Sequence, residues 1–126
     1  MKKMKGVLTA LAVTALLGGC ARTAPIMTPE TAITANVSAD KVKNAILEAG
    51  RKRDWIMTPV SPGVIEGKLI ARDHSVCIKV TYNATSYKIG YVDSQNLRAD
   101  DGKIHKNYNR WVNNLDKDIQ IRLAAQ

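Results

Sequence analysis

Hydrophobic residues recur at every second position through the middle of this chain and at a helical spacing on either side of it. In residues 75–82, Val76, Ile78 and Val80 point to one face and the residues between them to the other. Comparable patterns predict strands over 55–60, 64–71 and 87–92. Short polar connections join these segments, so neighbouring strands should pair antiparallel as a meander.

Two amphipathic segments flank the predicted strands. Ser38 is suited to cap the first helix, in which Val42, Ala45, Ile46 and Ala49 share one face at 100° per residue; Gly50 and the polar run that follows it indicate the end. The last helix is predicted over 106–123. Its apolar arc comprises Tyr108, Trp111, Val112, Leu115, Ile119 and Leu123, with Lys106, Arg110 and Lys117 opposite. These elements predict an α+β domain over residues 38–126: a two-layer structure with a four-stranded antiparallel meander sheet and the N-terminal and C-terminal helices on one face.

The N-terminus has the organisation of a secretory signal. Three lysines precede an apolar stretch at residues 7–17, which is too short to span a bilayer, and Leu17-Gly18-Gly19-Cys20 follows. This tetrapeptide resembles a bacterial lipobox, and the resemblance implies cleavage after residue 19 and acylation of Cys20. Two or more acyl chains anchor a protein stably in a membrane. Because Ala21 stands where lipoproteins retained at the inner membrane typically carry Asp, the resemblance favours the periplasmic face of the outer membrane over the inner membrane.

Removing residues 1–19 lowers both the length and the net charge of the protein. The 126-residue chain carries a net charge of +8, and losing three lysines leaves +5 on 107 residues. That length excludes a large enzyme or a multidomain receptor. A periplasm-facing location makes nucleic acid a poor partner and anionic phospholipid or cell-wall polymer a better one, although solvated basic faces are the simpler interpretation.

Acylation of Cys20 would leave Cys77 as a single thiol, so no intramolecular disulfide is expected. Its position between Val76 and Ile78 favours a buried structural thiol over a redox or catalytic nucleophile. Residues 20–37 are rich in Thr and Ala with two prolines, which predicts a flexible tether reaching at most about 60 Å. If part of this segment docks on the domain, we expect it to be residues 32–37.

Little in the sequence points to catalysis, a metal or a cofactor. His74 and His105 lack the spacing of zinc ligands, although His74, His105, Asp73 and Cys77 would form a site if the fold joined them. Asp93, Ser94 and His105 include the residue types of a catalytic triad, but no sequence motif for a catalytic serine accompanies them. Glycine-rich phosphate-binding loops are absent from the sequence. We therefore expect no enzymatic activity and no cofactor.

Polar and aromatic residues crowd the connection between the last predicted strand and the last helix. They are Ser94, Asn96, His105, Tyr108, Asn109 and Trp111. One interpretation is a small binding cleft for a sugar, a peptide or a partner loop. The other, which we favour, is that they cap the helix, close turns and fill the core.

The sequence thus predicts a lipid-anchored envelope protein that acts as a non-catalytic binding, accessory or structural module. The globular part resembles small proteobacterial lipoproteins of unknown function, a likeness that implies no activity. The alternative is a small periplasmic hydrolase or an inhibitor of a cell-wall-degrading enzyme. An envelope protein complex or a cell-wall polymer is the expected partner.

Overall fold

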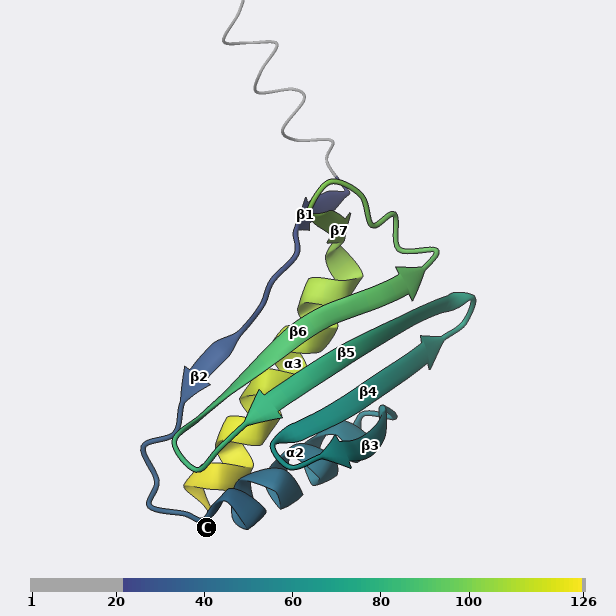
Figure 1. The fold of residues 1–126 in the computed structure, drawn as a ribbon. Helices are drawn as coiled ribbons and strands as arrows, with labels where there is room; N and C mark the ends of the chain where they lie inside the picture. Colours follow the sequence, from purple (N-terminus) through teal and green to yellow (C-terminus); the bar gives the residue numbers. More distant parts are fainter. Residues whose placement is uncertain (1–21, 126) are drawn as a thin grey trace, which may run out of the picture.

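The structure, a computed structural model, describes residues 22–125 (Figure 1). The predicted signal peptide and the predicted acylation site Cys20 lie outside the described residues. In the part that is described, two helices pack against an antiparallel sheet, which confirms the α+β class.

Both helices form where the sequence places them. Helix α2 (Ala39–Lys52) begins after Ser38, whose hydroxyl accepts a hydrogen bond from the Lys41 amide at 3.2 Å. It ends in a left-handed turn: Asp54 has φ +69°, and the Trp55 N–H donates to the Gly50 carbonyl at 3.0 Å. Helix α3 (Lys106–Ala124) matches the predicted span to within one residue.

The main sheet has five strands rather than the predicted four. Its order is β2 (Glu30–Ala32), β6 (Ser86–Gln95), β5 (His74–Tyr82), β4 (Val64–Ala71) and β3 (Ile56–Ser61), and every neighbouring pair is antiparallel. Strands β3 to β6 form the expected meander. A second sheet pairs β1 (Thr23–Pro25) with β7 (Lys103–His105).

Figure 1 shows α2 and α3 side by side behind one face of the main sheet. The core lies between these layers and combines the predicted helix faces with alternate strand residues, including Ile46, Ile78, Val80, Ile89 and Leu115, all fully buried. In the chain from residue 22 to 125, no helix is long and apolar enough to cross a membrane.

The prediction of a flexible tether over 20–37 is wrong for the part that the structure describes. Residues 23–25 and 30–32 are strands, and the Ile89 N–H donates to the Pro29 carbonyl at 2.9 Å. Asn109 of α3 holds the segment between them: its side chain accepts from the Met27 amide and donates to the Pro25 carbonyl. The local pattern does not reveal these strands, because β6 and β7 supply their backbone partners.

Two predicted core residues lie outside the buried core instead. Cys77 is only half-buried, because alternation along β5 turns it away from the face that Val76 and Ile78 present to the helices. Trp111 is also partly exposed, since it lies beside the buried stripe of α3 that includes Val112.

Candidate functional site

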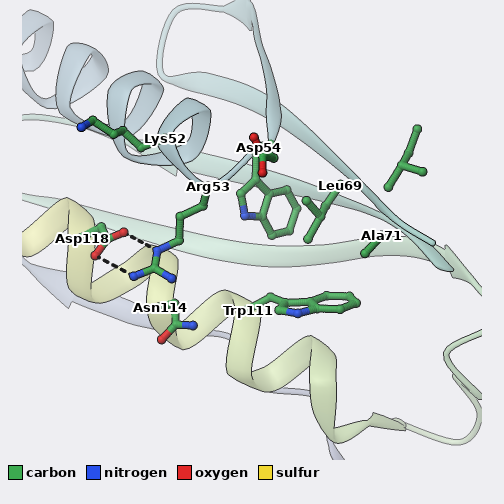
Figure 2. Close-up of a pocket in the computed structure, with 10 residues that line it drawn as sticks. Lys52, Arg53, Asp54, Leu69, Ala71, Trp111, Asn114 and Asp118 are labelled. Atoms are coloured by element: carbon green, nitrogen blue, oxygen red, sulfur yellow. Dashed lines mark hydrogen bonds and ion pairs between the residues drawn. The ribbon is translucent and has the colours of Figure 1, made fainter.

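A groove of about 690 Å³ that offers both aromatic and charged groups lies between α2, β4 and α3. We call it the tryptophan groove. Ten residues line it: Lys52, Arg53, Asp54, Trp55, Leu69, Ile70, Ala71, Trp111, Asn114 and Asp118. Figure 2 shows Trp111 on α3 opposite Leu69 and Ala71, with Arg53 reaching from the end of α2 toward Asp118.

The local structure of each element explains these positions. The left-handed turn at Asp54 ends α2 and directs Trp55 inward, where it is only 3% exposed. Alternation along β4 buries Leu69 and leaves Ile70 60% exposed at the rim. Trp111 closes the opposite side with a partly exposed indole ring.

An ion pair crosses one end of the groove. Arg53 donates from Nε to one carboxylate oxygen of Asp118 and from a terminal nitrogen to the other at 3.5 Å, which joins the end of α2 to α3. The hydrogen bond to Asp118 raises the pKa of Arg53 above its ordinary value. Both side chains contact solvent, so we expect the pair to position the helix ends more than to stabilise the fold.

The remaining groups of the groove suit binding. Leu69 and Ala71 form an apolar strip opposite the Trp111 ring, and Asn114 adds an amide that can donate and accept hydrogen bonds. Lys52 and Asp54 place one charge of each sign at the rim. An aromatic wall with a few polar groups is typical of a ligand or peptide site.

Five of the six residues predicted as a possible cleft have a role within the fold. Ser94 shares a 2.7 Å hydrogen bond with the Tyr91 hydroxyl, and Asn96 donates to the Asp73 carbonyl. His105 caps α3 by accepting from the Asn107 amide at 3.1 Å. These contacts support the structural interpretation for Ser94, Asn96 and His105.

Of the other three predicted residues, Tyr108 and Asn109 also serve the fold. Tyr108 is fully buried, meets the Tyr91 ring edge-on with 5.6 Å between centroids, and has a pKa raised by burial. Asn109 holds the N-terminal segment, as described above. Trp111 alone among the six lines the tryptophan groove.

The histidines and the thiol do not come together as a reactive centre. The hydrogen bonds of His105 and Ser94 go to other partners, and His74 binds the Asn96 carbonyl through Nδ1 at 2.8 Å. Burial raises the pKa of Cys77, and the nearby Asp93 raises it further, which disfavours the nucleophilic thiolate. Among residues 22–125, no group of three or more His, Cys, Asp and Glu side chains could hold a metal ion.

Sequence reasoning missed most of the groove. It treated residues 51–54 as a helix end and Trp55 as the first residue of a strand, which left Arg53 and Asp118 without a specific role. Their separation of 65 positions gives no local signal of contact. The position of Trp111 at the edge of the apolar arc was the feature that could have indicated a surface-facing aromatic residue.

Comparison with known proteins gives no independent identification. The chain matches no known protein family and has no similar sequence among curated proteins.

Proposed function

We propose that this chain is a lipid-anchored protein of the bacterial envelope, held through acylated Cys20 at the periplasmic face of the outer membrane. The basic start, the apolar stretch at 7–17 and the sequence Leu17-Gly18-Gly19-Cys20 support this proposal. The described fold begins at Arg22, so cleavage before Cys20 would remove none of its elements.

The domain acts as a non-catalytic accessory module that binds an extended segment of another envelope protein in the tryptophan groove. The observation that carries this role is the partly exposed Trp111 ring facing the apolar strip of Leu69 and Ala71. Partly exposed aromatic residues with an apolar surround are typical anchor points of protein interfaces. A protein segment fits better than a sugar polymer because the strip beside the ring is aliphatic.

Metabolic labelling with palmitate tests the anchor. Wild-type protein should incorporate the label and a Cys20→Ala variant should not, because the thiol is the acylation site. Equal labelling of the two proteins would refute the anchor.

Photo-crosslinking in cells tests the groove. A photoreactive amino acid at Asn114, which lines the groove, should capture a protein partner, and adding Trp111→Ala should abolish the capture. Val92, which is 49% exposed on a strand outside the groove, is the matched control position. Equal capture from both positions would contradict the groove as the contact site. Crosslinks from position 114 to glycan alone would replace the protein partner with cell-wall polymer.

A further inference from the structure

The anchored residue and the folded domain are separated by a very short piece of chain. Only Ala21 lies between Cys20 and Arg22, and the backbone carbonyl of Arg22 already accepts a hydrogen bond from the Lys106 amide at 3.2 Å. Two residue steps span about 7 Å even when fully extended. The place where β1 enters the fold must therefore lie close to any membrane that holds an acylated Cys20.

Contacts along the N-terminal segment keep this distance short. The Ile26 amide donates to the Gly102 carbonyl at 2.9 Å, and the Asn109 side chain bonds the backbone of Pro25 and Met27. Further along, the Thr31 hydroxyl donates to the Asp116 carboxylate at 2.9 Å. Extending the tether would require breaking these bonds.

The surface around this entry point is basic. We call it the basal end and define it as residues 22–25 together with residues 96–106. The β1–β7 pairing joins these two segments, and the His105 amide donates a 2.8 Å hydrogen bond to the Leu97 carbonyl. Four exposed basic side chains lie here with two exposed carboxylates: Arg22, Arg98, Lys103 and Lys106 with Asp100 and Asp101. The adjacent turn between β4 and β5 adds Arg72 and Asp73, one charge of each sign.

We propose that the basal end docks on the anionic phospholipid headgroups of the membrane that holds Cys20, so that the domain stands on this end. This inference rests on the proposed acylation of Cys20. Each basic residue near an anionic surface strengthens binding by roughly fivefold, and the short connection supplies the proximity. Figure 1 shows α3 running away from the basal end to the C-terminus.

This orientation places the rest of the molecule at defined heights. Helix α3 has 19 residues, a length of about 28 Å at 1.5 Å per residue, so Ala124 lies far from the headgroups. Trp111 comes five positions after Lys106, about 8 Å along the same helix. The tryptophan groove then opens to the side, close to the membrane, where it meets partners that lie along the bilayer.

Energy transfer to labelled headgroups tests the orientation. The acylated full-length protein, in a Cys77→Ser background, carries a donor dye at Gln95→Cys beside the basal end or at Ala125→Cys at the far end. It is reconstituted into vesicles of phosphatidylethanolamine and phosphatidylglycerol that contain acceptor-labelled lipid. We expect strong transfer from position 95 and weak transfer from position 125. Equal transfer from both positions in protein that floats with the vesicles would overturn the docked orientation and leave the anchor intact.

Charge variants test which surface holds the domain. Lys103→Gln combined with Lys106→Gln should lower the docking equilibrium by roughly 25-fold and bring the two transfer values together. Lys41→Gln combined with Lys43→Gln removes the same charge from the first turns of α2 and should leave transfer unchanged. Equal effects of the two pairs would refute the basal end as the docking surface. Protein that carries no acyl chain and does not float would refute the anchor and this inference with it.

Discussion

Gly50 of α2 packs against Met57 of β3, and this contact predicts that the effect of Gly50→Ala on stability reverses when Met57 is shortened. A Cβ at Gly50 would lie 2.6 Å from Cγ and Sδ of Met57 and 2.8 Å from its Cε. Met57 is only 4% exposed, and its Sδ would also be 3.0 Å from a Cβ at Gly67. The side chain of Met57 is therefore confined between two glycines and has little room to move aside.

Replacing Gly50 with Ala improves helix propensity by about 1 kcal/mol, whereas overpacking a core costs about 1–3 kcal/mol. We expect Gly50→Ala to lower the free energy of unfolding by up to about 2 kcal/mol, because the close contacts outweigh the helical gain. In a Met57→Ala background the obstructing atoms are gone, so the same substitution should raise that free energy by up to about 1 kcal/mol.

Urea denaturation of the four proteins of this cycle, followed by circular dichroism, measures both effects. The difference between the two backgrounds is the coupling energy, which should equal the overpacking cost of about 1–3 kcal/mol. If Gly50→Ala has the same sign and size in both backgrounds, Met57 does not restrict position 50 and the packing argument is refuted.

Three further predictions concern single side chains. Asp54 has φ +69°, a conformation that glycine adopts without strain, so Asp54→Gly should raise the free energy of unfolding by about 0.5–1 kcal/mol, and a lower Tm would contradict this. The buried Tyr108 hydroxyl has no hydrogen-bond partner among residues 22–125, whereas the Tyr87 hydroxyl donates to a carboxylate of α3. In urea denaturation, Tyr108→Phe should therefore raise the free energy of unfolding by about 1 kcal/mol, and Tyr87→Phe should lower it by about 1–2 kcal/mol. Burial and Asp93 raise the pKa of Cys77, so the folded protein should react more slowly with iodoacetamide at pH 8 than the unfolded chain. Asp93→Asn should speed this reaction, which mass spectrometry can follow. No acceleration would show that Asp93 does not act on the thiol.

The proposed orientation and the proposed groove support a common arrangement. A domain that stands on its basal end keeps the tryptophan groove within reach of proteins that lie along the membrane. A domain on a long tether would instead present the groove in all directions. Because residues 22–33 are bound to the domain, the attachment point determines which surfaces of the domain face a partner.

The amino-acid pattern alone was enough to predict α2, α3 and the β3–β6 meander. In each of these elements the spacing of apolar residues indicates which face is buried. Val42 and Ile46 mark the buried face of α2, and Ile78 and Val80 mark that of β5. Ser38 marks the start of α2 because a cap is a local interaction. The lipobox-like sequence at Cys20 is equally local, and the proposal of a membrane anchor comes from it.

Only the tertiary structure decided the short strands and the groove. A three-residue strand such as β2 has too few positions to show a period, and it exists because the edge of β6 offers unpaired backbone groups. Likewise, Arg53 meets Asp118 and Trp111 faces β4 only after α2 and α3 have packed together. Periodicity records which side of an element avoids water, whereas contacts between distant segments depend on how those sides fit together in space.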